Sequence, residues 1–478
     1  MISYEAYQDQ EVIIKASVEV NSFKPSEGWR LGRGPGRQPE QPVRIWEIEL
    51  DPEDFKGYNP FCAVNILHDR LFIEYDKTDM TPEPFLSYIK VKGLTLAHAA
   101  TGAPVPQRGS LSCYRGHHWI IEDCTIDWSN GTGIDVGNEC WHHTRIEGQI
   151  LGSTIIRRNT IKNVGVCAIA GMFVSNMLIE DNLIVGTGWQ RMELSWEAGA
   201  IKFHHSVNSL IRRNVIRDSH GCDAIWLDVA NENNRITANL LLDGLDSREH
   251  IFMECTRDVE NMIDNNIIWN VEGRFDRDSL PQEPGSSGWY KKTDLGIKNG
   301  YGIYAEGTDR LRIANNLIGK CHKAGFFAKA VAFRIDRKRG GTSRENKFFN
   351  NIFYDCGDAA IIMHNEHNEA EGNVYSKMPG GYLRLKYPEP EMCLDLATWQ
   401  EFCGFDKTGA TADLTIEVDR EKLTMLVEVH DGLPVVARDA KVSTDYFSQA
   451  VEEESGVPGP FSKLKKGKHL FNIDPRKI

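Results

Sequence analysis

The feature of this sequence that most constrains its fold is an irregular repeat, in which an Asn is followed two positions later by an apolar residue. The Asn, replaced once by Cys, recurs at Cys124, Asn159, Asn182, Asn214, Asn239, Asn266, Asn316, Asn351 and Asn373. The steps between these positions are 35, 23, 32, 25, 27, 50, 35 and 22 residues. A minimum step with a variable excess is typical of a solenoid whose coils share one core and carry loops of different length.

Within each coil the apolar residues follow the two-residue period of short strands. Ile225 and Leu227, for example, alternate with Trp226 and Asp228, whereas a helical repeat needs apolar residues three and four positions apart. We therefore predict an all-β fold, a right-handed parallel β-helix. We interpret the recurrent Asn as a corner ladder, because Asn tolerates tight-turn backbone angles and its amide can hydrogen-bond to the equivalent turns above and below.

The rhythm of the repeat divides the chain into three parts. Residues 1–22 and 88–375 are predicted to form the β-helix, and the Pro-rich and Gly-rich residues 23–87 an irregular excursion from it. Residues 376–478, where the repeat stops, are predicted to form a small α/β cap that closes the open end. The first seven residues resemble the interior of a coil, which predicts that a capping segment upstream is absent from the sequence.

Charge and composition restrict the partners. The net charge of −13 argues against nucleic acids and anionic membranes, which need a basic surface, and favours a neutral oligosaccharide. No apolar run reaches transmembrane length, and no charged-then-apolar segment opens the chain. Eleven Cys without regular spacing indicate scattered free thiols. We therefore expect a cytoplasmic protein, and the sequence leaves the formation of a homo-oligomer open.

Two acids occupy equivalent places in consecutive coils. Asp228 lies 11 residues before Asn239, and Glu254 lies 12 residues before Asn266. Neighbouring parallel strands are about 4.8 Å apart, so the two carboxyls should lie about 5 Å apart. Retaining glycosidases hold their carboxyls at about 5–5.5 Å, and inverting enzymes at about 6.5–9.5 Å. The spacing therefore predicts glycosidic bond cleavage with retention, and the pKa of one acid should rise because the two charges repel.

Other outward positions around these acids hold histidines, a lysine, further acids and aromatic residues, rather than the scattered small polar residues of a solvated sheet. The candidate substrate-binding residues are Glu197, Lys202, His204, Trp226, Tyr304, Glu306, His364 and Glu366. Lys202 and His204 are predicted either to anchor sugar hydroxyls or to pair with Asp228. Trp226 is predicted either to stack on a sugar or to shield the acids. The alignment of coils places His364 in the coil directly after Glu306.

Several of these segments resemble one known family. Trp226-Leu227-Asp228 and, one coil later, Ile251-Phe252-Met253-Glu254 are similar to the β-xylosidases of glycoside hydrolase family 120, a β-helix family. Similar segments also occur at residues 197–205, 58–61 and 2–7, so the likeness covers roughly residues 1 to 375. The resemblance implies that Asp228 is the nucleophile, that Glu254 is the acid/base, that xylose is the sugar released, and that no cofactor takes part.

The chain departs from this family in one respect. The family usually carries a β-sandwich inserted near its first coils. Here only 26 residues separate Phe61 from Tyr88, which is too few for such a domain. The inserted sandwich is therefore predicted to be reduced or missing.

Two other functions fit the same residues. In a Ca²⁺-dependent polysaccharide lyase, Asp228, Glu254 and Glu306 would form an all-oxygen metal site with Lys202 as the base. In a non-catalytic carbohydrate-binding β-helix, the same column would only hold sugar. Histidine metal sites are not expected, because the neighbours His117 and His118 should point to opposite faces of a strand, and the pair at residues 142–143 likewise.

Overall fold

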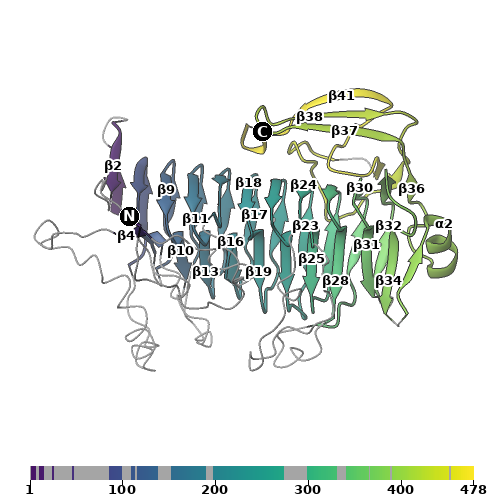
Figure 1. The fold of residues 1–478 in the computed structure, drawn as a ribbon, viewed down its shortest axis with the longest axis horizontal. Coiled ribbons are helices and arrows are strands. Elements are labelled where there is room, and N and C mark those ends of the chain that lie inside the picture. Colours follow the sequence, from purple (N-terminus) through teal and green to yellow (C-terminus); the bar gives the residue numbers. More distant parts are fainter. Residues whose placement is uncertain are drawn as a thin grey trace, which may run out of the picture.

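The computed structural model shows a long solenoid in which each coil contributes one strand to each of three parallel sheets (Figure 1). It describes residues 2–6, 10–15, 24–25, 46–47, 86–99, 109–113, 116–137, 152–189, 197–273, 299–330, 341–364, 367–387, 390–451 and 454–477. The predicted right-handed parallel β-helix is confirmed. No helix among these residues is both long enough and apolar enough to cross a bilayer.

The strands stack in register along each sheet. The first sheet contains β1 (Ile2–Glu5), β5 (Ile89–Lys92), β8 (Ile120–Glu122), β11 (Ile155–Arg157), β14 (Leu178–Glu180), β17 (Leu210–Arg212), β20 (Arg235–Thr237), β23 (Asn261–Asp264), β26 (Leu311–Ala314), β29 (Lys347–Phe349) and β32 (Glu369–Glu371). The second contains β2 (Val12–Lys15), β6 (Leu94–Ala97), β9 (Thr125–Ser129), β12 (Thr160–Val164), β15 (Leu183–Val185), β18 (Val215–His220), β21 (Leu240–Leu245), β24 (Ile267–Val271), β27 (Leu317–Cys321), β30 (Ile352–Tyr354), β33 (Val374–Ser376) and β36 (Ala410–Thr411). The third contains β7 (Gly109–Ser112), β10 (Thr132–Gly137), β13 (Cys167–Met172), β16 (Gly199–His204), β19 (Asp223–Asp228), β22 (Glu249–Glu254), β25 (Tyr301–Glu306), β28 (Ala324–Lys329), β31 (Ala359–His364) and β34 (Leu383–Tyr387). At its end β35 (Met392–Leu394) pairs antiparallel with β34.

The predicted Asn ladder forms the corner between the first and second sheets. Asn214, for example, donates from its side-chain amide to Oδ1 of Asn239 at 3.0 Å, and its backbone N–H donates to the same oxygen at 3.0 Å. This pattern repeats from coil to coil and ends at Asp406, whose carboxylate accepts from Asn373. The ladder satisfies polar groups that the stacked corners bury. It fixes the rung register on which the candidate site depends.

The C-terminal part agrees only partly with its prediction. The solenoid extends past residue 375, because β34 and β36 pair in parallel with β31 and β33. A short helical segment, α2 (Leu396–Thr398) followed by a π-helical turn (Trp399–Cys403), covers the open end and buries Trp399 completely in the core.

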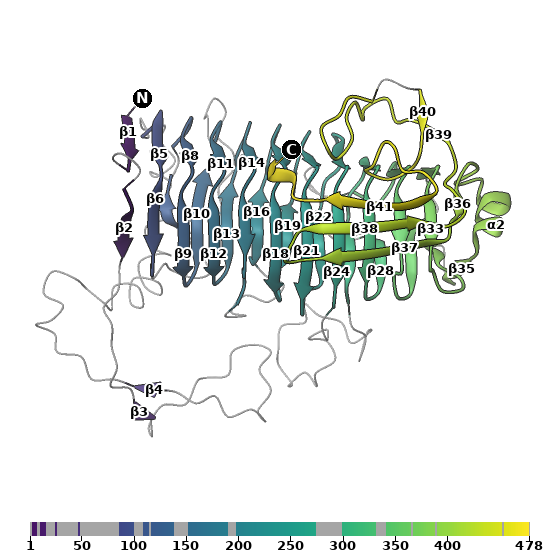
Figure 2. The ribbon, with the colours of Figure 1, turned by 90° about the horizontal axis from the view of Figure 1, so that it is seen from above.

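The rest of the C-terminal part lies on the side of the solenoid and not over its end. Here β37 (Leu414–Asp419), β38 (Thr424–Val429) and β41 (Gly467–Asn472) form an antiparallel sheet that runs along the solenoid above the second sheet (Figures 1 and 2). Apolar side chains of the two sheets form one core cluster, with Leu242 and Trp269 on the solenoid side and Ile416 and Val427 on the other. The remaining short elements of this part are β39 (Val436–Ala437), β40 (Ser455–Gly456) and a 3₁₀ turn (Pro475–Lys477).

Most of the predicted excursion at residues 23–87 lies outside the described residues. Within it, β3 (Lys24–Pro25) pairs antiparallel with β4 (Trp46–Glu47). Before it, β1 and β2 pair in parallel with β5 and β6, so the first residues belong to the solenoid. The cysteines that the structure describes are free thiols, and most of them are buried.

Candidate active site

The two acids predicted to be catalytic are the last residues of neighbouring strands in the third sheet, Asp228 in β19 and Glu254 in β22. In this parallel pair Leu227 lies opposite Met253, and each acid follows this pair by one residue. Leu227 and Met253 are fully buried in the solenoid core, so strand alternation turns both acids to the outer face. The two carboxyls are thus on adjacent rungs above an apolar interior, as the repeat predicts.

Asp228 is held by two side chains of the preceding strand, β16. Its Oδ2 atom lies 3.3 Å from Nζ of Lys202 and 3.1 Å from Nδ1 of His204. His204 is the direct rung neighbour of Asp228, and Lys202 stands two residues earlier on the same face. Both contacts reach the same carboxylate oxygen, and Oδ1 takes part in neither. The Asp228 carboxylate is therefore positioned next to positive charge, with one oxygen outside this pairing.

Glu197, immediately before β16, closes the contacts into a ring. Its Oε2 atom lies 3.1 Å from Nζ of Lys202 and 3.2 Å from Nε2 of His204. Burial by itself raises the pKa of Glu197, but Lys202 and His204 outweigh it and lower that pKa well below its usual range. Burial likewise opposes the charge of Lys202, yet the Glu197 and Asp228 carboxylates raise its pKa.

These ion-paired residues are buried although they lie on the outer face of the third sheet and not in the solenoid core. Lys202 is 0% exposed, Glu197 4% and Asp228 7%. A buried charge costs several kcal/mol unless it is paired, so the three charged groups depend on one another. Among the two roles predicted for Lys202 and His204, the geometry favours pairing with Asp228.

Glu254 has different surroundings. Its Oε2 atom accepts a hydrogen bond of 3.1 Å from Nε1 of Trp226, and the residue is 5% exposed. The Trp226 ring lies between the side chains of its two rung neighbours, Lys202 and Phe252. Nζ of Lys202 is 3.4 Å from the Trp226 ring centroid, and the Phe252 ring centroid is 5.0 Å from it. Because its neighbours on both adjacent rungs cover the indole, Trp226 shields the acids, and its faces are not available for stacking on a sugar.

Trp226 is the first of a row of stacked aromatic rings on the outer face of the third sheet, which we call the aromatic wall. Phe252 stacks on Tyr304 at 4.8 Å, and Tyr304 stacks on Phe327 at 5.3 Å. Tyr304, a predicted substrate-binding residue, is 4% exposed and donates from its hydroxyl to Oε2 of Glu306 at 2.7 Å. The wall gives the acids a rigid apolar flank.

Glu306 is the direct rung neighbour of Glu254 on the side opposite to Asp228. Three consecutive rungs therefore end in Asp228, Glu254 and Glu306. The two outer acids of the three have basic rung neighbours on their far sides, His204 beside Asp228 and Lys329 beside Glu306. The middle acid of the three stands between two carboxyl groups.

The predicted place of His364 is wrong by one rung. The strand β28 lies between β25 and β31, and its last residue, Lys329, is the rung neighbour of Glu306. The alignment missed this coil because Lys329 lies 22 residues before Asn351, whereas Glu306 lies only 10 before Asn316. His364 ends β31 and is buried. Glu366 lies outside the described residues.

Two cationic residues near the site were not predicted. Lys329 is exposed at the end of β28. Arg248 precedes β22 and lies over the wall, with its guanidinium carbon 4.7 Å from the Phe252 ring and 5.1 Å from the Tyr304 ring. It also forms an ion pair of 2.6 Å with Glu249. The outward strand positions alone do not predict Arg248, because it precedes the strand β22 and contacts the Phe252 and Tyr304 rings from outside that column.

A metal ion could be held by one group of residues, although not by the one predicted for a lyase. Glu197, His204 and Asp228 offer ligand atoms within 4.8 Å of one another, and no other such group occurs in the described part of the chain. The Lys202 ammonium already contacts the Glu197 and Asp228 oxygens of this group. Positive charge between the carboxylates is therefore supplied by the protein itself.

The interpretation of the paired histidines is also corrected. Nδ1 of His117 lies 2.7 Å from Nδ1 of His118, so the rings meet and do not diverge. The reason is that His118 has a left-handed backbone (φ 59°), so the pair sits in a turn and not in a strand. Residues 142–143 lie outside the described part of the chain.

Comparisons with known proteins agree with this architecture. The family model for a right-handed β-helix region matches residues 109–279, and no curated protein sequence matches the chain. XylC, solved in complex with xylose, aligns with a TM-score of 0.62 and 17% identity over 98% of this chain and 90% of XylC.

The chain is a right-handed parallel β-helix protein. The β-helix of XylC follows it over almost its whole length, so the resemblance to family 120 is supported at the level of the fold. Weaker similarities include the periplasmic alginate epimerase AlgG (TM-score 0.39, 10% identity, 60% of this chain and 68% of AlgG). Another is the exopolygalacturonase of Thermotoga maritima (TM-score 0.37, 12% identity, 64% of this chain and 81% of that enzyme).

Proposed function

We propose that this β-helix protein is a retaining glycoside hydrolase that releases xylose from β-linked oligosaccharides, with Asp228 as nucleophile and Glu254 as acid/base. The observation that carries the proposal is the unequal environment of two carboxyls on adjacent rungs. Asp228 faces Lys202 and His204, whereas Glu254 lies between two acidic rungs and against an aromatic wall.

The surroundings of Asp228 suit a nucleophile. Contacts from Lys202 and His204 to Oδ2 place the carboxylate next to positive charge and fix its orientation. Oδ1, which takes part in neither contact, is the oxygen that attacks the anomeric carbon. In this step the C1–Oδ1 bond forms, the bond from C1 to the glycosidic oxygen breaks, and a covalent glycosyl-enzyme results.

The surroundings of Glu254 suit a proton donor. Glu254 stands between carboxyl groups on both neighbouring rungs, and the Trp226 N–H orients its side chain. Glu254 then gives its proton to the departing glycosidic oxygen. In the second step its carboxylate takes a proton from water, the water oxygen attacks C1, and the bond from C1 to Asp228 breaks.

Xylose is proposed as the sugar for two reasons. The segments at Trp226–Asp228 and Ile251–Glu254 resemble the β-xylosidases of family 120, and XylC, solved with xylose, has the same fold. The net charge of −13 favours a neutral ligand over a polyuronate.

A panel of nitrophenyl glycosides, followed by proton NMR of the first product, tests this proposal. We expect turnover of the β-D-xyloside, with β-xylose as the first anomer released. Activity should be unchanged by EDTA, because Lys202 supplies the positive charge beside Asp228. If α-xylose is released first, or if neither the aryl glycosides nor xylobiose is cleaved, the proposal is wrong. Loss of activity with EDTA, restored by Ca²⁺, would favour the lyase.

A further inference from the structure

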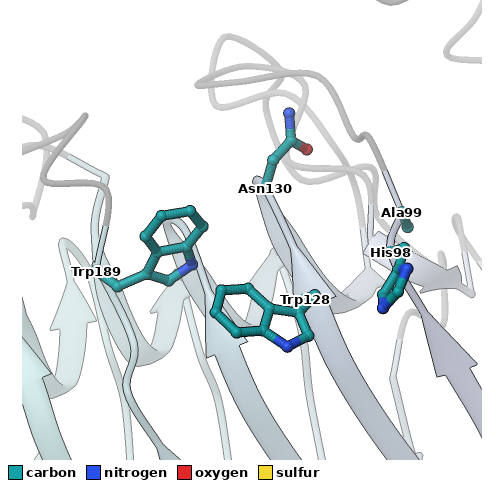
Figure 3. A pocket seen from close by; sticks show the side chains of 5 residues that line it. All are labelled: His98, Ala99, Trp128, Asn130 and Trp189. Atoms are coloured by element: carbon teal, nitrogen blue, oxygen red, sulfur yellow. The ribbon is translucent and has the colours of Figure 1, made fainter. Parts of the chain in front are cut away.

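A second aromatic surface lies at the corner between the second and third sheets, away from the acids. Trp128 and Trp189 are 48% and 40% exposed. Their rings meet edge to face, with centroids 5.4 Å apart and planes at 80°. Figure 3 shows the two indoles side by side on the surface, with His98 and Asn130 beyond them.

The backbone at Trp128 is unusual for so large a residue. It has a left-handed conformation (φ 57°), which bulky residues rarely adopt. The same corner position is left-handed in the other described coils too, where it is held by smaller or unbranched residues: His98, Asn163, Gly186, Asp218, Asp243, Asn270, Lys320, Asp355 and Lys377. Trp128 is the largest side chain at this corner. A half-exposed Trp at this position contributes no core packing that offsets its backbone strain.

Trp189 is fixed in place by the neighbouring coil. Its indole N–H donates to the backbone carbonyl of Asn163 at 3.0 Å, and Asn163 is the corner residue one rung after Trp128. The ring is therefore held against Trp128 without being buried. An exposed aromatic surface that is already rigid loses little entropy when it binds a ligand.

The tryptophans line a shallow hollow on the surface. Its volume is about 570 Å³, and its described lining consists of His98, Ala99, Trp128, Asn130 and Trp189. The hollow is shallow and open to solvent, so it suits a ligand that lies along the surface. No Asp, Glu, Lys or Arg occurs in this lining, so the surface fits a neutral ligand with both apolar and polar faces.

We infer that Trp128 and Trp189 form an accessory binding site for a neutral β-linked polysaccharide chain. Sugar rings present C–H faces that pack on indoles, and hydroxyls that face polar side chains. A protein partner is less suitable, because a stable interface buries on the order of 1,000 Å² or more. The choice of polymer rests on the proposed function, since a chain held here is the substrate that the acids cut.

The location of the site is consistent with this use. Trp128 precedes β10, whereas Asp228 ends β19, three strands further along the third sheet. At about 4.8 Å per rung and about 3.3 Å per residue, the tryptophans lie roughly 20–25 Å from the acids. A polymer bound at the corner is therefore tethered near the catalytic face without occupying it.

The test is affinity electrophoresis in gels that contain soluble arabinoxylan, with the variants W128N and W189A. Asn suits the left-handed corner, so W128N should unfold at the same temperature as the wild type or a higher one. We expect each variant to lose at least about tenfold in apparent affinity for the polymer. The catalytic efficiency on the nitrophenyl xyloside should not change, and F402A, at a distant exposed aromatic residue, should not change either quantity.

The outcomes separate this inference from the proposed function. If the variants lose polymer binding while the wild type cleaves no glycoside, the accessory site stands and the hydrolase proposal is wrong. If the aryl xyloside is cleaved but arabinoxylan retards neither the wild type nor the variants, or retards them equally, the accessory site is wrong. If the variants change only the oligomeric state in light scattering, the surface is a contact between copies of the chain.

Discussion

In the coils that contain the candidate site, the outer faces of the second and third sheets carry different residues, although buried side chains occur on both. The second sheet presents apolar side chains such as Leu242 and Trp269, and the antiparallel sheet β37–β38–β41 of the same chain covers them. The third sheet presents Lys202, Asp228 and Glu254, which are buried and joined by ion pairs and hydrogen bonds. The inner residues of both sheets are alike, so it is the outward residues that distinguish a packing face from a reactive face.

The comparison predicts that removing the cation of the third sheet has the largest effect on stability. In Lys202→Met the Glu197 and Asp228 carboxylates remain buried without their common partner, so we expect a loss of about 3–5 kcal/mol in the free energy of unfolding. Activity should fall at least about 100-fold. Denaturant unfolding and steady-state kinetics measure these effects. Lys320→Met, which removes an exposed lysine paired with Asp355, should change stability by less than about 0.5 kcal/mol.

The loss in Lys202→Met should depend on pH. The pKa of Glu197 is lowered in the folded protein, so its ionised form stabilises the fold above its ordinary value of 4.5, and this contribution is lost as the pH falls further. The pKa of Lys202 is raised, so its contribution persists from neutral pH into the alkaline range. The gap between wild type and variant should therefore be full at pH 7 and shrink below about pH 4.5. A gap that is constant from pH 7 to pH 3 would contradict the ion-pair ring.

A change on the second sheet should lower stability without touching the chemistry. Leu242 is 1% exposed beneath the antiparallel sheet, so Leu242→Ala should cost about 2–4 kcal/mol by leaving a cavity. The kcat of the folded protein should remain that of the wild type. Leu470→Ala, at a residue of β41 that is 72% exposed, serves as the matched control and should be nearly neutral. If kcat falls with Leu242→Ala, the two faces are not independent.

The smallest expected effect concerns the third acid. Glu306→Gln keeps an acceptor for the Tyr304 hydroxyl but removes the negative charge next to Glu254. Glu254 should then lose its proton more easily, so the alkaline limb of the kcat/KM profile should move to lower pH by on the order of one unit or less. The same profile for Glu417→Gln, at an exposed residue of β37, should stay in place. An unchanged limb in Glu306→Gln means that Glu306 does not affect the proton donor.

The sequence was sufficient for those parts of the molecule that depend on local periodicity. Strand alternation and the Asn corners placed Asp228 and Glu254 on adjacent rungs, because each coil repeats the same short-range pattern. The rung of Lys329 was missed because a longer loop separates it from the next Asn corner. The side packing of the C-terminal sheet was also missed, although the outward apolar residues Leu242 and Trp269 were a usable signal for it.

Other features depend on contacts that no spacing in the sequence specifies. Glu197 was among the predicted residues, but its closure of the Lys202 and His204 contacts into a ring follows from side-chain directions in the folded structure. The covered faces of Trp226 likewise follow from packing against its rung neighbours. That Trp128 is unusually large for its position becomes visible only when the same corner is compared between coils in the folded structure.

The central claim is that the outer face of the third sheet is catalytic, with Asp228 as the nucleophile. The most direct test is the variant Asp228→Gly with an aryl β-xyloside and added azide. We predict a loss of at least about 10⁴-fold in kcat, partial recovery with azide, and α-xylosyl azide as the product identified by NMR. A β-xylosyl azide would show that the roles of Asp228 and Glu254 are exchanged. Activity close to that of the wild type would show that this face is not the catalytic site.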